Sequence, residues 1–225
     1  HKYIAYFQAF TNTYASVEYL RRIYMEAIQD PDVQILSIAT RPDCLPEDIL
    51  QLLEEINQIK PVWVELGLQT IHPQTATYIR RGYPLEVFEE AVNNLRRRNI
   101  SVITHTILGL PGENEDMMLE TIDYLNKMDI QGIKLQLLHI LKGTDLALDY
   151  EKQPFWSPTM EEYISLLGKC IARLRPDITI HRLTGDGPKE LLIAPLWTSQ
   201  KRTVLNTLHR YLKEQDIWQG KEYHV

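Results

Sequence analysis

The chain has 225 residues, 44% of them hydrophobic, so it is long enough for one large domain or two small ones with a sizeable core. Its net charge of −6 excludes a global basic field of the kind that attracts nucleic acid, apart from short basic runs at Arg96–Arg98 and Lys201–Arg202. No apolar run approaches the roughly 18 residues of a membrane span, no secretory signal is visible, and two separated cysteines, Cys44 and Cys170, suit a cytoplasmic protein.

Six apolar runs of strand length recur along the chain. They cover Tyr3–Gln8, Val33–Ala39, Val62–Leu68, Ile100–Ile107, Ile133–Ile140 and Ile178–Leu183. Most of them are apolar on nearly both faces, which is typical of parallel strands covered by helices. Because the first run begins almost at residue 1, we expect this chain to be part of a longer protein.

Helical patterns lie between these runs. Each pattern begins with residues that favour the start of a helix, namely Ser16, Pro46, Pro84, Asn114 and the pair Ser157–Pro158. A last helix is expected over roughly Gln200–Leu212. The alternation predicts an α/β fold with a parallel sheet and right-handed crossovers.

The number of strands indicates how complete the architecture is. A full eight-stranded barrel takes about 250 residues, so six strands in this chain predict a partial (β/α) barrel of the TIM type. We expect residues 1–185 to form the barrel, and residues 186–225 to form a helical extension packed on it. In such folds the chemistry lies at the carboxyl ends of the strands, so the candidate site residues are those that end or follow a predicted strand.

Three histidines close three of the predicted strands in similar settings. They are His105 in "HTILG", His139 in "HILKG" and His181 in "HRLTG". With Glu65 inside another strand, they have the ligand types of a zinc or manganese site in a barrel lyase or isomerase. The alternative is that one or more of these histidines only hydrogen-bond within the rim of the barrel, since strand-end spacing alone is weak evidence for a metal site.

A glycine-rich turn, "GLPGE" at Gly109–Glu113, joins a predicted strand to a predicted helix. Gly109 and Gly112 allow the backbone to approach a ligand closely, and the helix behind them offers N–H groups that suit an anion. A plain strand-to-helix turn has the same pattern.

Two further polar sets follow strands. Thr11, Asn12 and Thr13 come soon after the first strand, together with Gln8, and can hold an ammonium or carboxylate group or cap the next helix. Gln69 follows the third strand, and Arg81 lies twelve residues later, where it could pair with a carboxylate or remain a solvated charge.

In combination and in this order, four segments resemble the radical S-adenosylmethionine (SAM) superfamily, in particular the Elongator catalytic subunit and the oxygen-independent coproporphyrinogen oxidases. The segments are "AYFQAFTNTYASVEYL", "LSIATRPDCLPEDIL", "VELGLQTIHPQTATYIRRGYPLEVFEEAV" and "VITHTILGLPGENEDMMLETI". The resemblance covers about residues 3–150. The tail "HRLTGDGPKELLIAPLW" looks like the bacterial group of YtqA and YhcC.

The resemblance implies a partial barrel of the radical SAM type and a set of SAM contacts. Gln8, Thr11, Asn12 and Thr13 would meet the methionine amino group, Gln69 and Arg81 the ribose and carboxylate, and His105 the ribose. Gly109 would lie in the loop that faces the cofactor. The backbone from His139 to Leu141 would contact the adenine. It also implies reductive cleavage of SAM by a [4Fe-4S] cluster, hydrogen abstraction from substrate, an electron donor such as flavodoxin or ferredoxin, and tRNA wobble uridine as the first substrate to test.

The chain departs from the family pattern at the cluster. Relatives carry three closely spaced cysteines after a strand that precedes the first one here, and neither Cys44 nor Cys170 can replace that triad. We therefore expect the first strand and the cluster loop to lie outside this chain, which alone would be inactive. The competing hypotheses are a metal-dependent barrel enzyme that uses Glu65, His105 and His139, and a noncatalytic module that binds tRNA or protein.

Overall fold

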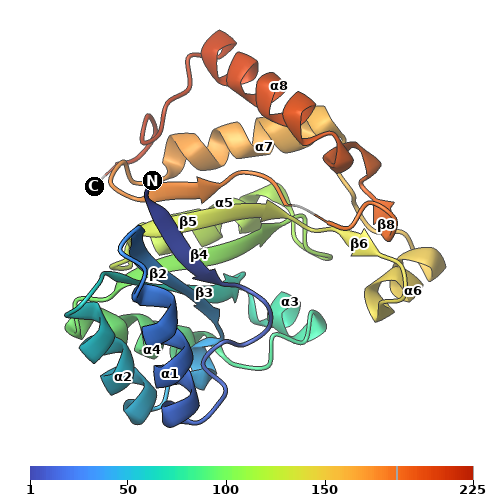
Figure 1. Ribbon diagram of the computed structural model, residues 1–225. Helices are drawn as coiled ribbons and strands as arrows, with labels where there is room; N and C mark the ends of the chain where they lie inside the picture. The colour runs from blue at the N-terminus through green and yellow to red at the C-terminus, as the bar shows by residue number, and fades with distance from the viewer. Residues whose placement is uncertain (186, 225) are drawn as a thin grey trace. The chain divides into compact units, whose positions relative to one another are not determined.

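The computed structural model describes residues 1–185 and 187–224. The strands are β1 (Tyr3–Phe7), β2 (Val33–Thr40), β3 (Val62–Gln69), β4 (Ser101–Leu108), β5 (Gly132–Leu137), β6 (Ile140–Leu141), β7 (Thr179–Arg182) and β8 (Leu192–Ala194). The α-helices are α1 (Val17–Ile28), α2 (Glu47–Asn57), α3 (Pro73–Tyr78), α4 (Leu85–Arg97), α5 (Glu115–Leu125), α6 (Asp145–Lys152), α7 (Met160–Arg173) and α8 (Lys201–Glu214), with short 3-10 helices η1 (Pro42–Cys44) and η2 (Leu196–Ser199) (Figure 1).

Six strands form one sheet in the order β1-β2-β3-β4-β5-β7. The β1–β2 and β2–β3 pairs are parallel, and helices connect the successive strands. The predicted fold class, an α/β protein with a partial (β/α) barrel, is therefore confirmed. None of the helices in the described part of the chain is long and apolar enough to cross a membrane.

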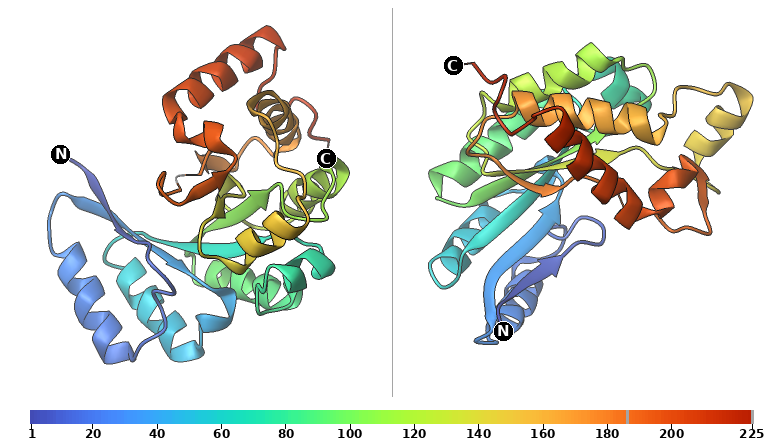
Figure 2. Two further views of the ribbon diagram at one scale, coloured as in Figure 1. Left: turned by 90° about the vertical axis from the view of Figure 1, so that its right-hand side faces the viewer. Right: turned by 90° about the horizontal axis from the view of Figure 1, so that it is seen from above.

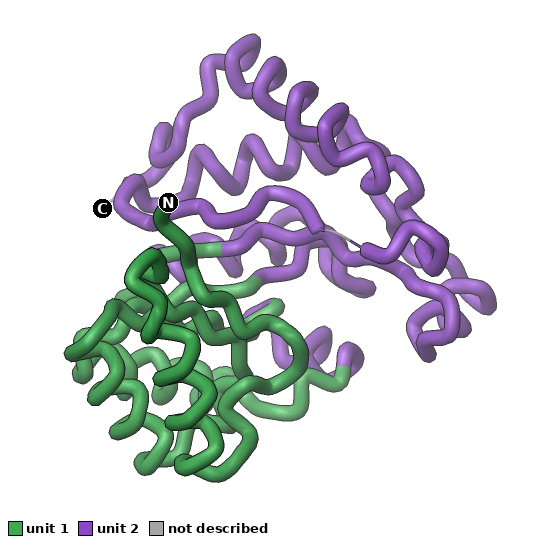
Figure 3. The backbone as a smooth tube through the Cα atoms, in the orientation of Figure 1, with its two compact units in different colours: residues 1–69, 80–105, 129–133 green, residues 70–79, 106–128, 134–225 purple. Residues whose placement is uncertain are grey.

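The chain divides into two compact units (Figure 3). The first comprises residues 1–69, 80–105 and 129–133, and the second comprises residues 70–79, 106–128 and 134–225. The division predicted from the sequence, between residues 1–185 and 186–225, remains a prediction.

The first unit buries one face of its strands beneath helices. Alternate residues of β3 are almost completely buried, namely Val62, Val64, Leu66 and Leu68, and both α2 and α4 contact this strand. The amphipathic faces of these helices supply the opposing side chains, including Leu53 of α2 and Phe88 of α4. The other residues of β3 point to the opposite face of the sheet, because side chains alternate along a strand.

The second unit packs α5 and α8 against α7, as the views in Figure 2 agree. Tyr163 and Leu167 of α7 and Leu208 of α8 are completely buried. Gly168 lets α8 approach closely, since a Cβ atom there would lie 2.9 Å from Tyr211 Cε1.

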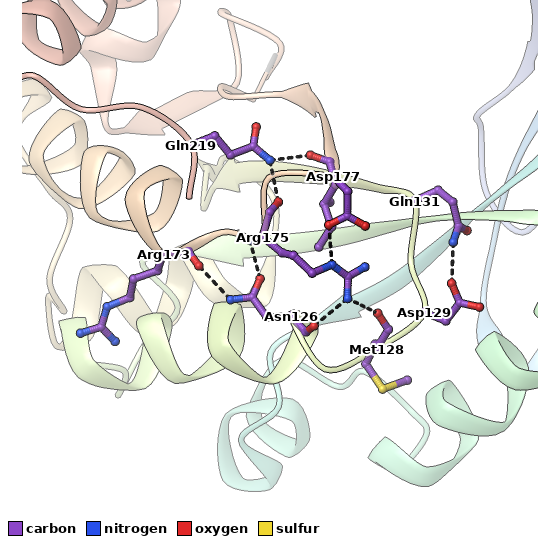
Figure 4. Close-up of polar contacts among 9 residues, drawn as sticks. Asn126, Met128, Asp129, Gln131, Arg173, Arg175, Asp177 and Gln219 are labelled. Carbon is purple, nitrogen blue, oxygen red and sulfur yellow. Dashed lines mark hydrogen bonds and ion pairs between the residues drawn. The ribbon is translucent and has the colours of Figure 1, made fainter. Parts of the chain in front are cut away.

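Asn126 holds the end of α5 to the segment that follows α7 (Figure 4). Its amide donates to Arg173 O at 2.8 Å, and its Oδ1 accepts from the backbone N–H of Arg175 at 2.8 Å. Gln219 in turn donates to Arg175 O at 2.8 Å and to Ile178 O at 2.7 Å. These bonds satisfy carbonyl groups left over at a helix end and in a connection, which fixes the C-terminal segment on the second unit.

The structure differs from the predicted elements at several places. The run Ile133–Ile140 is not one strand: β5 ends at Leu137, and Ile140 belongs to β6, which pairs antiparallel with β8. Pro46 and Pro84 are the N-cap residues of α2 and α4, not their first helical residues. Thr159, with a capping box to Glu162, starts α7 in place of Ser157. The short helices α3 and α6 were not predicted, because neither has enough turns to show an apolar period.

Candidate functional site

A buried carboxylate on β3, Glu65, accepts hydrogen bonds from three other strands of the sheet. Tyr6 Oη on β1 donates to Glu65 Oε2 at 2.8 Å, and Ser37 Oγ on β2 donates to Oε1 at 2.9 Å. Nε2 of His105 on β4 lies 2.7 Å from Oε2. All four residues belong to the first unit, and we call them the Glu65 cluster.

Strand register explains how side chains so distant in sequence meet. In the parallel β1–β2 pair Tyr6 is the partner of Ser37, and in the β2–β3 pair Ala39 is the partner of Glu65. Residues two apart on a strand share a face, so Ser37 and Glu65 lie on the same side of the sheet as Tyr6. That side is opposite to the face covered by α2 and α4.

Burying the carboxylate of the Glu65 cluster costs folding free energy. Glu65 is 4% exposed and Ser37 is 2% exposed, whereas the His105 side chain is 20% exposed. A carboxylate in such a place loses its hydration and is retained only with several donors around it. Since apolar side chains would fill the sheet at lower cost, the cluster is a candidate site, with its accessible part at His105 and Tyr6.

The cluster also fixes the histidine. With Nε2 held by the Glu65 carboxylate, the orientation of the imidazole ring is set, as in carboxylate–histidine pairs of many sites. The arrangement can therefore present an oriented imidazole and a phenol to a polar ligand. Sequence reasoning singled out Glu65 and His105 but missed Tyr6 and Ser37, whose signal was a polar atom inside an otherwise apolar strand.

Some polar residues of the loop after β1 hydrogen-bond to the backbone, and others are accessible to solvent. Asn12 Nδ2 donates to Ala39 O at 2.9 Å and to Phe7 O at 3.2 Å, and Thr13 donates to Cys44 O at 2.5 Å. These two side chains thus hold the loop against β2 and η1. Gln8 is exposed and Thr11 is half-buried, so both of these polar side chains are accessible to a ligand.

Gln69 and Arg81 both lie at the carboxyl end of β3, but with different surroundings. Gln69 has a left-handed backbone, with φ at 67°, and its side chain folds over Gly67, where a Cβ atom would lie 2.7 Å from Nε2. Arg81 is 7% exposed and donates to Leu68 O at 3.1 Å and to Tyr83 O at 3.0 Å. Burial lowers the pKa of Arg81. Its guanidinium braces the end of β3.

The turn Gly109–Glu113 in the second unit has the conformation that its glycines allow. Gly109 and Gly112 have φ values of 79° and 84°, which only glycine adopts without strain. At the start of the helix that follows the turn, one free backbone N–H group already has an acceptor. Asn114 Oδ1 caps α5 by accepting from Met117 N at 3.0 Å. Glu113 is buried, accepts from Thr70 Oγ1 at 2.5 Å, and has its pKa raised by that burial.

His139, Leu141 and His181 also lie in the second unit. The imidazole of His139 packs against two glycines, because a Cβ atom on Gly187 or Gly185 would lie 2.7 or 2.9 Å from its ring atoms. Leu141 is in β6 opposite Leu192 of β8. His181 is in β7 and half-buried.

Among residues 1–185 and 187–224, no group of three or more His, Cys, Asp or Glu side chains is arranged to hold a metal ion. Cys170 is completely buried in α7, and burial raises its thiol pKa to about 12, so it is a poor source of thiolate. Burial also raises the pKa of Cys44. These two cysteines therefore do not fit a four-iron cluster. In the family that the sequence resembles, such a cluster takes three closely spaced cysteine thiolates.

Sequence profiles of two families match consecutive parts of the chain. "Radical SAM superfamily" matches residues 1–125, and "Radical_SAM C-terminal domain" matches residues 130–214. Together the two matches include every strand and every helix described above.

Curated relatives are similar over nearly the whole chain. The chain is 46% identical over 220 residues to Uncharacterized protein YtqA of Bacillus subtilis, covering 98% of this chain and 68% of that protein. It is 37% identical over 217 residues to Protein YhcC of Escherichia coli, covering 96% and 70%. A more distant relative, tRNA uridine(34) acetyltransferase of Methanocaldococcus jannaschii, is 23% identical over 190 residues, with 81% and 33% covered.

Solved structures share the fold. Elp3 of the archaeon Methanocaldococcus infernus, with an N-terminal deletion, superimposes with a TM-score of 0.81 over 97% of this chain and 55% of its own, at 18% identity. Coproporphyrinogen III oxidase (HemN) of Escherichia coli, a radical SAM enzyme, gives a TM-score of 0.55 over 72% and 37%, also at 18% identity. At these identities the likeness shows the fold alone.

Proposed function

The chain belongs to the radical SAM superfamily of enzymes, and on that premise we propose that it is the SAM-binding barrel portion of such an enzyme, with the cluster ligands outside this chain. Members of the superfamily use SAM and a [4Fe-4S] cluster. The observation that carries the proposal is that the superfamily profile covers β1 to β4, the strands that build the Glu65 cluster.

The residues of the first unit divide into ligand contacts and supports. Gln8 and Thr11, which are accessible, offer an amide and a hydroxyl to the methionine part of SAM. Gln69 offers its amide to the ribose or carboxylate. The side chains of Asn12, Thr13 and Arg81 donate to backbone carbonyls, and so position the backbone that carries these contact residues.

His105 is the contact to the ribose, and Glu65 orients it. A hydrogen bond from one ring nitrogen to the carboxylate leaves the ring in a single orientation, so that it loses little rotational entropy when SAM binds. The predicted contacts in the second unit, namely Gly109, His139 and Leu141, remain proposals. Bound together with a reduced cluster, SAM supplies hydrogen-atom abstraction, and the role of this chain is to position it and exclude water.

Binding of SAM tests the proposal directly. Equilibrium dialysis with radiolabelled SAM is expected to show saturable binding to this chain, and S-adenosylhomocysteine is expected to compete for it. Absence of saturable binding, or anaerobically reconstituted cluster-bearing protein that fails to cleave SAM under dithionite, would overturn it. An electron donor of the flavodoxin or ferredoxin type and a cytoplasmic location are parts of the same proposal.

For the substrate, we propose transfer RNA. The support is the distant relative that bears the name of a tRNA uridine(34) acetyltransferase, together with similarity to Elongator complex protein 3 of Schizosaccharomyces pombe. A chain of net charge −6 needs a local basic surface to meet phosphates. The test is mass spectrometry of tRNA nucleosides from cells with and without the gene, in which unchanged wobble uridines contradict the proposal.

A further inference from the structure

Helix α8 is strongly basic, in contrast to the acidic balance of the whole chain. Its 14 residues include four Lys or Arg and one Glu, a net charge of +3. Since the whole chain is −6 and α8 is +3, the remaining residues carry −9. A basic helix on an acidic chain makes a local field that is not explained by overall composition.

The polar side chains of α8 line one face. Arg202, Asn206, His209 and Lys213 are spaced by four, three and four residues, which places them in a row, and Arg210 lies beside it. We call these five residues the α8 stripe; all of them are exposed. At 1.5 Å of rise per residue, the row is about 16 Å long.

The opposite face of α8 fixes the helix in place. Val204 and Leu208 are 1% and 0% exposed, and α8 packs on α7 through this apolar side (Figure 2). The α8 stripe is therefore a preformed surface, and a partner that binds it does not have to order the helix. The acidic residue of α8 is Glu214, whose Oε1 lies 3.9 Å from Arg210 Nε, a distance at which an exposed pair contributes little.

An exposed aromatic residue follows the helix. Trp218 is 55% exposed, and Lys221 Nζ lies 4.7 Å from its ring centroid. Ile217 N–H donates to Leu212 O at 2.8 Å, so the chain turns back directly after α8. Three exposed cations on one helix face, Arg202, Arg210 and Lys213, with an exposed indole close by in sequence are a combination that binds nucleic-acid backbones and unstacked bases.

From these observations we propose that the α8 stripe binds the phosphate backbone of an RNA, with Trp218 stacking on an unpaired base. This inference rests on the RNA substrate proposed above and names the surface that meets it. The surface lies in the second unit, outside the Glu65 cluster.

The test is a salt titration of tRNA binding. Unfractionated bacterial tRNA is bound to the chain and to the variant Arg202→Gln/Arg210→Gln/Lys213→Gln at several salt concentrations. Loss of three phosphate contacts reduces the slope of log K against log salt by roughly 2 to 3, and lowers affinity at about 100 mM salt roughly 10- to 100-fold. The matched control, Arg22→Gln/Arg97→Gln/Lys127→Gln, removes the same charge from exposed positions elsewhere and should leave the slope unchanged.

A second variant separates stacking from charge. Trp218→Ala is expected to weaken tRNA binding without changing the salt slope, because stacking releases no counterions. Equal losses in the stripe variant and its control would overturn the proposal, since net charge alone would then explain binding. So would absence of tRNA binding, or binding of anionic phosphatidylglycerol vesicles in its place. SAM binding is measured on the same samples, so a chain that binds SAM but not tRNA refutes the stripe and leaves the SAM-binding function standing.

Discussion

Nε2 of His105 and Oε2 of Glu65 lie 2.7 Å apart, although 40 residues separate them in the chain. The same carboxylate oxygen accepts the hydroxyl of Tyr6 at 2.8 Å. Replacing Glu65 by Ala leaves three donors without their acceptor, which is expected to lower the free energy of unfolding by about 3–5 kcal/mol. Glu65→Gln keeps the shape and one acceptor, so a smaller loss is expected.

Urea unfolding measures this difference. Glu55→Ala is the control, because Glu55 contacts the side chain of Arg21 but is exposed, and its removal should leave the unfolding free energy unchanged. If Glu65→Ala unfolds at the same urea concentration as the parent chain, the Glu65 cluster is not the buried network described above.

His105 is expected to contribute to SAM affinity. His105→Ala removes the proposed ribose contact and should raise the Kd for SAM about tenfold, equivalent to about 1.4 kcal/mol. His72→Ala is the matched control, since His72 Nε2 lies 2.8 Å from Met117 O in another part of the chain. Calorimetric titration with SAM compares the three proteins, and equal Kd values would remove His105 from the site.

Glu113 makes stability depend on pH in a predictable direction. Burial raises its pKa in the folded chain above the ordinary 4.5, so the folded state holds this proton more tightly than the unfolded state. The stabilising contribution is fully present below pH 4.5 and is lost as the pH rises through the folded pKa. The unfolding free energy of the parent chain relative to Glu113→Gln should therefore fall as the pH rises from about 4 to 7.

The comparison needs a carboxylate that does not have this environment. Glu161 is exposed, and Glu161→Gln is the control in the same measurements, because it removes one carboxylate without removing a buried group. A pH-independent difference for Glu113→Gln would show that burial does not shift this carboxyl group.

The two glycines of the "GLPGE" turn offer a matched pair. Both have positive φ, but a Cβ atom on Gly109 would lie 3.1 Å from Leu137 Cδ1, whereas one on Gly112 meets nothing within 4 Å. Gly112→Ala should cost about 1 kcal/mol of backbone strain, and Gly109→Ala should cost more, about 1–3 kcal/mol. Thermal and urea unfolding rank the two variants, and the reverse order contradicts the close packing at Gly109.

The two thiols should react at very different rates. Cys44 is partly exposed, whereas Cys170 is completely buried with a pKa of about 12. A disulfide reagent such as Ellman's at pH 8 is expected to label one thiol in the folded chain and the second only after unfolding. Cys44→Ser identifies the reactive residue, because this variant should show no labelling until it unfolds.

The sequence by itself determined most of the secondary structure and the fold class. Strand β3 could be predicted, over Val62–Leu68, because its run is apolar on nearly both faces, as in parallel strands covered by helices. Capping residues Ser16 and Asn114 defined two helix starts. The polar residues at strand ends could be chosen as candidates because parallel strands bring their carboxyl ends to one edge.

Only the tertiary structure decided which contacts those residues make. From the sequence, Arg81 could pair with a carboxylate or remain a solvated charge; in the structure it is buried and donates to backbone carbonyls. The side chains of Asn12 and Thr13 donate to backbone carbonyls around their loop. Tyr6 and Ser37 could not be linked to Glu65, because their meeting depends on the register of three strands, which no local pattern encodes. Secondary structure follows from short-range periodicity, whereas a site is made by long-range pairing, and that is fixed only when the sheet assembles.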